Sequence, residues 1–531
     1  MTLPTCCSSG TAPPPACWRG CGAHHWNCAL PSRRPPVADG KPATFAAQVR
    51  SAVIWRSGSQ IGTQIVSWAS TLIVIRLLAP QDYGLFAMAQ VMLVLLNTMN
   101  GYGLASALIR EEEVTEERLR QTLGMLMLLN GGLALIQFTA APLVAMWFEE
   151  PQVANLLRVQ SLLYLCIPFC ALSHAILSRR MDFRRPAQVR LVAAIAGAGT
   201  ALTGALSGWG VWTLVAAPLV MLLTEAIGMT RAARTPVIPI FRFEGAGHIA
   251  GFGGVMTMTQ LFWFVQSQAD VMIAGRVLDT HDLGVYTTGL FLAQLLAAKF
   301  VPPINEVAYA AYSRQPEIGA PALLATIRLV MLVALPAYAG LAVVAPVLVP
   351  VLLGEHWIEI VPLLPILACA MAMMTLQILF APATNARGVP MAALRITMIG
   401  SVVMTSAFYI GSHFGIEGFA WAWVGGMAVL TIATVRLSGG IIGLRIEGLA
   451  RAILPPLGAA LAMAAGVALL LHLLPAVPDL LALAIAVPVG VGLYLGILHR
   501  IAPDRIDEAL RFARNRGESE EEPAPAPAPA E

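Results

Sequence analysis

Long uncharged stretches alternate with short charged segments along most of the chain. In the first part these stretches cover Ser57–Ile75, Gly84–Leu108, Gln121–Phe148, Val159–Ser178 and Leu191–Thr224. A helix that crosses the hydrocarbon core of a bilayer needs about 20 apolar residues, so each stretch predicts a transmembrane helix. The last stretch is long enough for two helices, and Ser207-Gly208-Trp209-Gly210 predicts the turn between them. Six helices are expected here.

The rest of the chain continues the same pattern with eight further uncharged stretches. They are Ile249–Ala269, Leu283–Ala298, Leu329–Gly354, Ile360–Ala386, Ile396–Ile416, Gly418–Val435, Ala452–Pro478 and Leu480–Leu498. The Leu283 stretch is short, and it spans a bilayer only if the ammonium group of Lys299 extends to the interface. The chain is therefore predicted to be an all-α integral membrane protein with about 14 transmembrane helices.

The composition supports this class. Hydrophobic residues make up 57% of the 531 residues and charged residues only 12%, whereas about 25% of the residues of a soluble domain are charged. The formal net charge of +3 is small, and the basic residues are dispersed over many loops. We therefore expect no nucleic-acid partner.

The distribution of Lys and Arg predicts the orientation of the chain. Cytoplasmic loops of membrane proteins are enriched in basic residues. If both tails and every second loop lie on one side, 30 of the 33 basic residues are found there, and only Arg76, Arg158 and Arg276 lie opposite. Both termini are therefore expected in the cytoplasm.

The N-terminal extension is rich in cysteine. Five of the eight cysteines are Cys6, Cys7, Cys17, Cys21 and Cys28, on the side that is expected to be reducing, so no disulfide framework is predicted. Together with His24 and His25 they offer zinc ligands, but their spacing matches no standard zinc site. We expect a disordered extension and no metal site.

Two segments of the chain repeat at an offset of 200 residues. Arg76–Phe86 aligns with Arg276–Tyr286, with the Arg, one Leu, the Asp and the Gly identical, and Ser59-Gln60 aligns with Thr259-Gln260. Six helices separate the copies. Because six is an even number, both copies cross the membrane in the same direction. The repeat therefore predicts two parallel lobes related by an axis along the membrane normal, which enclose a central cavity.

These observations predict the organisation of the chain. It comprises a disordered cytoplasmic extension (1–50), a first six-helix lobe (51–230), a cytoplasmic linker (231–247), a second six-helix lobe (248–440), two C-terminal helices (450–499) and a cytoplasmic tail with a surface helix and a disordered Pro-Ala end (500–531).

The repeated motif Arg-x-Leu-x-x-x-Asp-x-Gly has two interpretations. In the structural one, Asp82 and Asp282 cap the helices that follow and glycine permits the turn. That interpretation does not explain why Arg76 and Arg276 occupy equivalent positions on the side that is poor in basic residues. The alternative is that these two arginines form a gate at the outer mouth.

Four segments resemble a known transporter family. They are Ala52–Gln60, Arg76–Gly84, Leu177–Arg185 and Gly208–Leu214. Over residues 50 to 450 the chain resembles the polysaccharide transporter, or Wzx-like, lipid-linked oligosaccharide flippases of the MOP superfamily, which also contains the MATE drug exporters. The resemblance implies transport of an undecaprenyl-diphosphate-linked oligosaccharide from the cytoplasmic to the periplasmic leaflet of a bacterial inner membrane, for O-antigen, capsule or exopolysaccharide assembly. Membrane lipids are the other expected partners. Cooperation with a glycan polymerase and export machinery is left open.

Such a cargo needs two kinds of side chain. Cationic groups near the cytoplasmic entrance would bind the diphosphate, and Arg56, Lys299 and Arg395 are the candidates, although ordinary positive-inside anchoring also explains them. Hydrogen-bonding groups within the bundle would bind the glycan. The candidates are Gln60, Gln260, Asn97 and Asn100, from a polar set that also includes Gln64, Asn130, Gln266, Gln268 and Gln294. Hydrogen bonds between helices are the alternative for this set.

Asp270 lies near the outer end of its predicted helix, where a carboxylate must be paired, hydrated or protonated. It is a candidate for coupling transport to Na⁺ or H⁺, and a salt bridge to a neighbouring helix is the alternative. No Gly-x-x-x-x-Gly-Lys loop occurs, so no nucleotide cofactor is expected and alternating access is the expected mechanism.

Two other functions remain as alternatives. A MATE-like exporter of small cations would share the two lobes but would usually lack the last two helices and would favour acidic residues in its cavity. A membrane glycan polymerase or ligase would need a loop that can fold outside the membrane, and the longest outer loop, Asp270–Asp282, is too short. We therefore expect a transporter and not an enzyme.

Overall fold

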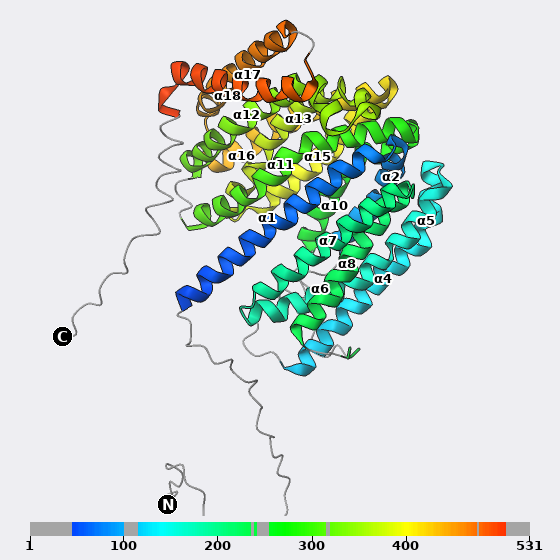
Figure 1. Cartoon of the computed structure of the whole chain (residues 1–531). Coiled ribbons are helices and arrows are strands. Elements are labelled where there is room, and N and C mark those ends of the chain that lie inside the picture. The colour runs from blue at the N-terminus through cyan, green and yellow to red at the C-terminus, as the bar shows by residue number, and fades with distance from the viewer. Residues whose placement is uncertain are drawn as a thin grey trace, which may run out of the picture. The chain divides into compact units, whose positions relative to one another are not determined.

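The computed structural model describes residues 45–99, 115–234, 238–241, 254–314, 319–474 and 477–505, and the regular secondary structure of these residues is helical with no strand (Figure 1). The chain forms two compact units, residues 1–51 and 52–531. Of the first unit, the structure describes the start of the first helix. All packing discussed below lies within the second unit.

Within the described residues, the first half of the chain has seven helices. They are α1 (Phe45–Leu77), α2 (Pro80–Asn97), α4 (Glu116–Phe148), α5 (Pro151–Gln160), α6 (Leu162–Arg179), α7 (Arg184–Leu206) and α8 (Val211–Ala233). The second half contains α10 (Gly254–Val277), α11 (Thr280–Arg314), α12 (Gly319–Leu352), the 3₁₀ helix η3 (Glu355–Ile360), α13 (Leu363–Ile378), α14 (Phe380–Ala386), α15 (Pro390–Gly411), the 3₁₀ helix η4 (Ser412–Phe414) and α16 (Gly415–Ile442). Two further helices follow, α17 (Ile446–Leu473) and α18 (Asp479–Ile501).

The turn predicted inside the longest uncharged stretch is present. Helix α7 ends at Leu206 and α8 begins at Val211, and the backbone φ angles of Gly208 and Gly210 are 72° and 56°. Side chains with a Cβ rarely adopt such left-handed conformations, which explains the two glycines. The predicted break is confirmed.

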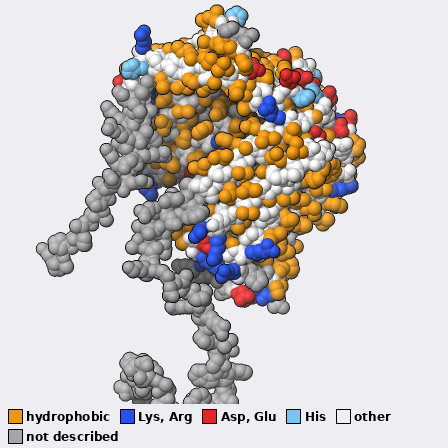
Figure 2. All heavy atoms as spheres, in the orientation of Figure 1, with side chains coloured by type: hydrophobic (Ala, Val, Ile, Leu, Met, Phe, Trp, Pro, Cys, Tyr) orange, Lys and Arg blue, Asp and Glu red, His pale blue; other side chains and the backbone are white. Residues whose placement is uncertain are grey.

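The helices have the length and composition of a multi-pass membrane protein. Ten helical stretches among the described residues are long and apolar enough to cross a bilayer, and one of them contains both α15 and α16. Hydrophobic side chains dominate the face drawn in Figure 2, and charged side chains gather toward its ends. The all-helical membrane fold is confirmed, while the count of fourteen stays a prediction. Helix α11 continues past Lys299 to Arg314, well beyond its apolar stretch.

The two copies of the repeat contact each other reciprocally where α2 and α11 begin. A Cβ on Gly84 would clash with the carbonyl oxygen of Thr280, and a Cβ on Gly284 would clash with the carbonyl oxygen of Pro80. Gly84 and Gly284 are 200 residues apart, as are Pro80 and Thr280, which is the offset of the sequence repeat. Reciprocal contacts of this kind are the signature of a two-fold relationship. We call this contact, made by residues 80–84 and 280–284, the seam.

The seam also shows where the capping prediction is correct and where it is wrong. In the first copy, the Asp82 carboxylate accepts a hydrogen bond from the backbone N–H of Ala79 at 3.2 Å, as expected. In the second copy, Asp279 takes the capping role and accepts from the backbone N–H of Asp282 at 2.7 Å. An aspartate at the residue before a helix can accept this bond, whereas alanine cannot.

The largest cluster of buried apolar residues joins the two halves. It includes Met88 and Phe148 from the first half and Tyr286 and Trp357 from the second. The indole N–H of Trp357 donates to the carbonyl oxygen of Ile75 at 2.9 Å, which connects η3 to the last turn of α1. Burial across this boundary stabilises the contact between the halves.

Helices α17 and α18 pack together against α12 (Figure 1). The hydroxyl of Tyr494 donates to the carbonyl oxygen of Leu332 at 2.7 Å. Both helices lie outside the region that contains the repeat. The lobe boundaries remain predictions. Helix α1 already begins at Phe45, within the extension expected to be disordered, whereas residues 1–44, most of the 231–247 linker and the tail after residue 505 lie outside the described residues.

Candidate functional site

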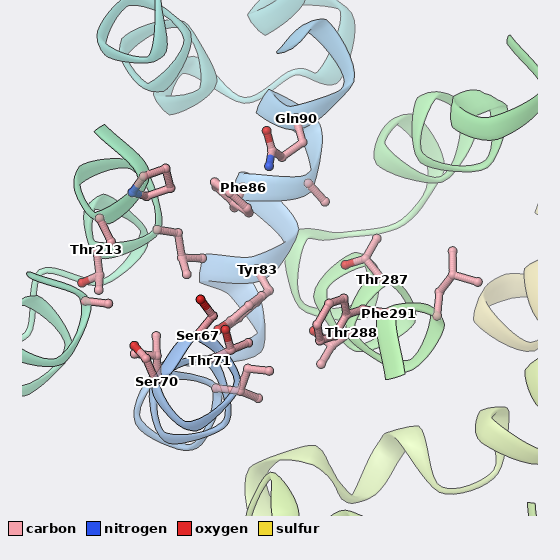
Figure 3. Close-up of a pocket in the computed structure, with 18 of the residues that line it drawn as sticks. Ser67, Ser70, Thr71, Tyr83, Phe86, Gln90, Thr213, Thr287, Thr288 and Phe291 are labelled. Carbon is pink, nitrogen blue, oxygen red and sulfur yellow. The ribbon is translucent and has the colours of Figure 1, made fainter. Parts of the chain in front are cut away.

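A central cavity of about 500 Å³ lies between the two halves. Helices α1, α2, α7 and α8 of the first half and α10 and α11 of the second half contribute its walls. Figure 3 shows Ser67, Ser70 and Thr71 on α1 opposite Thr287 and Thr288 on α11, with α2 between them. The cavity therefore occupies the interface that two parallel lobes were expected to form.

Most of the lining is apolar, but hydroxyl and amide groups are spread over several helices. The polar lining residues are Ser67, Ser70, Thr71, Tyr83, Gln90, Thr213, Ser267, Gln268, Asp270, Thr287, Thr288 and Gln294. Asp270 is the only charged residue among the described residues of the lining. The cavity can offer hydrogen bonds to a neutral polar ligand, but it offers no cation to an anionic one.

The carboxylate of Asp270 is held by hydrogen bonds rather than by a salt bridge. Its side chain is only 1% exposed, and it accepts a hydrogen bond from the hydroxyl of Tyr286 at 2.9 Å. The indole of Trp423 in turn donates to the Tyr286 hydroxyl at 2.7 Å. No Lys, Arg or His pairs with this carboxylate in the described part of the chain. The salt bridge considered from the sequence is not formed, because its neighbours on α11 and α16 are aromatic.

A second, more polar cavity of about 400 Å³ is enclosed by α1, α6 and α7. We call it the side cavity. Gln60, Gln64, His174 and Arg190 line it, and Ser67 lines both this cavity and the central one. The two cavities therefore adjoin. Glu225 of α8 accepts a hydrogen bond from the Arg190 guanidinium at 3.2 Å.

A third cavity of about 630 Å³ is a groove between α11 and α12. Its walls are mostly apolar, and Phe300 and Val307 are 61% and 60% exposed. Three basic residues, Lys299, Arg328 and Arg505, line it, and no acidic residue does so among the described residues. We call it the α11–α12 groove.

Lys299 connects the groove to the side cavity. Its ammonium group donates to the side-chain oxygen of Gln64 at 3.2 Å, and this bond joins α11 of the second half to α1 of the first. Gln60 and Arg76 are sixteen residues apart on α1, which corresponds to about 24 Å at 1.5 Å per residue. The side cavity therefore lies far from the seam, toward the other end of the bundle.

At the seam end, several contacts join the two halves. Arg276 of α10 forms an ion pair with Glu149 at 2.8 Å and donates to the carbonyl oxygen of Trp147, also at 2.8 Å. A side-chain nitrogen of Gln81 lies 3.1 Å from Nδ1 of His281. The bundle is thus closed at the seam, whereas the side cavity and the Lys299 end of the groove lie toward the other end.

The structure brings together only part of the predicted site. Gln60 and Lys299 lie in adjoining cavities. Arg395 and Gln260 are exposed and line none of the three cavities. Asn97 is exposed at the end of α2, the side chain of Arg56 is not among the described side chains, and Asn100 lies outside the described residues.

The two gate candidates have different surroundings. Arg276 connects the halves, whereas Arg76 has no hydrogen bond or ion pair to any residue that the structure describes and lies near Gly354. The repeat placed both arginines at equivalent positions on the backbone. Glu149 and Gly354 follow the ends of α4 and α12, the third membrane helix of each half, so the surroundings differ because one segment offers a carboxylate and the other a glycine without a side chain.

Sequence reasoning missed several cavity residues. Ser67, Ser70, Thr71, Gln90, Thr213 and Thr288 line the central cavity, His174 and Arg190 the side cavity, and Arg328 and Arg505 the groove. Serine and threonine barely change the hydropathy of a helix, so they carry little signal there. The recurrence of Ser67, Ser70, Thr71 and Val74 at helical spacing on α1 was the available signal.

Comparison with solved structures shows the fold of known transporters. The structure of the lipid II flippase MurJ in an inward closed conformation superposes with a TM-score of 0.68 at 14% identity, and the match covers 85% of this chain and 100% of that one. An inward-facing multidrug resistance transporter of the MATE family of the MOP superfamily superposes with a TM-score of 0.58 at 18% identity, covering 74% and 98%. At these identities the likeness concerns the fold.

Comparison of sequences shows the family. The succinoglycan biosynthesis transport protein ExoT of Rhizobium meliloti (strain 1021) is 25% identical over 385 residues, which cover 72% of this chain and 78% of that protein. The family model described as polysaccharide biosynthesis protein matches residues 73–362, which is more than half of the chain. The chain is therefore a multi-pass membrane transporter that belongs to the polysaccharide biosynthesis protein family.

Proposed function

We propose that this transporter is a flippase that moves an undecaprenyl-diphosphate-linked oligosaccharide from the cytoplasmic to the periplasmic leaflet of the inner membrane. The glycan would enter O-antigen, capsule or exopolysaccharide assembly. Such a cargo has three chemically different parts: a long apolar tail, a diphosphate and a polar glycan. The protein would have to provide an environment for each of them.

The observation that carries the proposal is that three matching environments adjoin. The α11–α12 groove is apolar and suits the lipid tail, while Lys299, Arg328 and Arg505 suit an anionic headgroup. Through the bond between Lys299 and Gln64, the groove meets the side cavity, which adjoins the hydroxyl-lined central cavity. A sugar chain needs hydrogen-bonding groups of this kind. A small drug would not need the groove.

The mechanism that we propose is alternating access. The seam end would face the periplasm, as the distribution of basic residues predicts, and the contacts at the seam would keep it closed while cargo enters from the cytoplasmic side. Opening requires breaking the Arg276–Glu149 ion pair and the contact of Gln81 with His281. Exposed ion pairs contribute about 0.2–1 kcal/mol each, so a closed seam of this type is reversible.

Asp270 is our candidate for coupling transport to Na⁺ or H⁺. It is a buried carboxylate on the wall of the central cavity with a neutral hydrogen-bonding partner and no counter-charge within the described chain. Binding a cation or a proton would remove the cost of an isolated charge in the membrane. The same feature favours the alternative function, a MATE-like exporter of small molecules.

A charge reversal tests the flippase proposal. In a strain that lacks the gene, wild-type protein should restore glycan export, and Lys299→Glu should fail to restore it while lipid-linked glycan accumulates in the cytoplasmic leaflet. Arg436→Glu is the matched control, because Arg436 is an exposed basic residue that lines none of the three cavities. It should behave like wild type.

Two outcomes would reject the proposal. One is full glycan export by Lys299→Glu at normal protein level. The other is normal export in the deletion strain together with accumulation of cationic drugs in its cells, which would support the exporter.

A further inference from the structure

At the seam, side chains of α11 and η3 form a cluster of residue types that can bind a metal ion. His281 and Asp282 begin α11, and Glu359 lies on η3. One ligand atom from each of the three lies within 4.8 Å of the other two. Nε2 of His281 is 2.9 Å from a carboxylate oxygen of Glu359, and their side chains are 31% and 60% exposed. An ion from the surrounding water could therefore reach the cluster.

The internal repeat provides a control for this cluster. The first copy reads Ala79-Pro80-Gln81-Asp82, and the second reads Asp279-Thr280-His281-Asp282. The same backbone turn thus carries an imidazole in the second copy where the first has an amide, and a carboxylate where the first has a methyl group. Two metal-ligand side chains are present in the second copy alone.

The carboxylate of Asp282 is also available. In the first copy the equivalent Asp82 is used as a helix cap, but in the second copy Asp279 caps the helix. No hydrogen bond to the Asp282 carboxylate occurs among the described residues, and Asp282 instead faces His281 and Glu359. Because Asp279 caps the helix in the second copy, the carboxylate of Asp282 is available beside the imidazole of His281 and the carboxylate of Glu359.

The charge of the cluster also points to a cation. Asp279, Asp282 and Glu359 bring three carboxylates to one place, and in the described part of the chain no Lys or Arg forms a salt bridge with any of them. Carboxylates that share a site repel each other. A divalent ion would neutralise part of this charge.

The ligand set favours zinc over calcium or magnesium. Calcium and magnesium prefer oxygen ligands only, whereas an imidazole suits zinc, copper or nickel. Zinc bonds of about 2.0–2.2 Å in tetrahedral geometry place neighbouring ligand atoms about 3.3 Å apart. The spacing of at most 4.8 Å requires only small side-chain movements to reach this value. A water molecule would complete the coordination.

We propose that His281, Asp282 and Glu359 bind a zinc ion beside the seam. Zinc would join α11 to η3 and fix the imidazole that contacts Gln81 of α2. Because Gln81 belongs to the first half of the chain, bound zinc would favour the closed seam. No motif in the sequence predicts this site, because Glu359 lies far along the chain from His281 and Asp282.

Zinc binding by the purified full chain in nanodiscs tests the proposal. Equilibrium dialysis should show that His281→Gln and Glu359→Gln each bind one zinc equivalent fewer than wild type. The first change installs the residue that the other copy has, and the second keeps the shape of the side chain. His499→Gln is the control, because His499 is an exposed histidine outside the cluster. The N-terminal cysteines contribute equally to all four proteins.

Thermal unfolding provides the second measurement. Because a ligand that binds the folded state stabilises it, zinc should raise the unfolding temperature of wild type and His499→Gln by more than that of the two cluster variants. Equal zinc stoichiometry in wild type and both cluster variants would overturn the proposal. A variant that unfolds at a lower temperature without zinc but still binds the full number of equivalents would also overturn it.

Discussion

Gly84 and Gly284 face each other across the seam, and each backbone nitrogen lies within 3.2 Å of the position that a Cβ on the other glycine would take. The start of α2 and the start of α11 therefore approach as closely as backbones can. The approach is possible because glycine has no Cβ at either position. The two glycines are equivalent in the repeat and meet each other from opposite halves of the chain.

Substitution of either glycine should open the seam. In Gly284→Ala the new methyl group would meet the carbonyl oxygen of Pro80, which cannot move without its helix. We expect a loss of about 1–3 kcal/mol of stability, as for other overpacked sites, and loss of glycan export. Gly425→Ala is the control, since no atom lies within 4 Å of its added Cβ. Wild-type export and an unchanged unfolding temperature in Gly284→Ala would contradict the prediction.

The ion pair between Arg276 and Glu149 tests the outer gate. Arg276→Glu places two carboxylates where an ion pair stood, so export should fall several-fold. The exchange Arg276→Glu with Glu149→Arg should recover part of the export, because opposite charges again face each other. Arg76→Glu should have the smaller effect, as Arg76 has no ion-pair partner in the described chain. Equal loss in the single variants of both arginines, with no recovery in the exchange, would refute this gate.

Asp270→Asn tests the coupling role. The amide keeps the size of the side chain and can accept from the Tyr286 hydroxyl, so folding should be preserved. Transport in vesicles should lose its dependence on an imposed Na⁺ or H⁺ gradient. Asp479→Asn, at the exposed start of α18, is the control and should keep that dependence. If Asp270→Asn transports with the same gradient dependence as wild type, Asp270 does not couple transport to either ion.

Trp357→Phe tests the contact between η3 and α1. The carbonyl of Ile75 is among the last four of α1, which lack partners within the helix, and the Trp357 indole satisfies it. Phenylalanine fills most of the volume but cannot donate, so the loss should be about 1–3 kcal/mol and should appear as a lower unfolding temperature. Trp421→Phe is the control, because Trp421 is 59% exposed. An equal unfolding temperature for both variants would argue against the bond.

The sequence by itself determined the helices and their repeat. A membrane span must be long, apolar and internally hydrogen-bonded, and these requirements are local, so the uncharged stretches and the break at Ser207–Gly210 could be predicted. The repeat at an offset of 200 residues predicted two parallel lobes around a central cavity, but it did not predict that the two copies meet at Gly84 and Gly284.

The tertiary structure alone decided which side chains share a cavity. Gln60 and Gln260 are equivalent in the repeat, yet only Gln60 lines one of the three cavities. Arg276 pairs with Glu149 at the end of α4, and His281 contacts Glu359 of η3, so both partners are distant in sequence. Asp270 accepts a hydrogen bond from Tyr286 of α11, which Trp423 of α16 in turn contacts. Hydropathy places a residue along the membrane normal but does not determine which way its helix is rotated. That rotation results from packing against neighbouring helices, and it decides which polar groups meet.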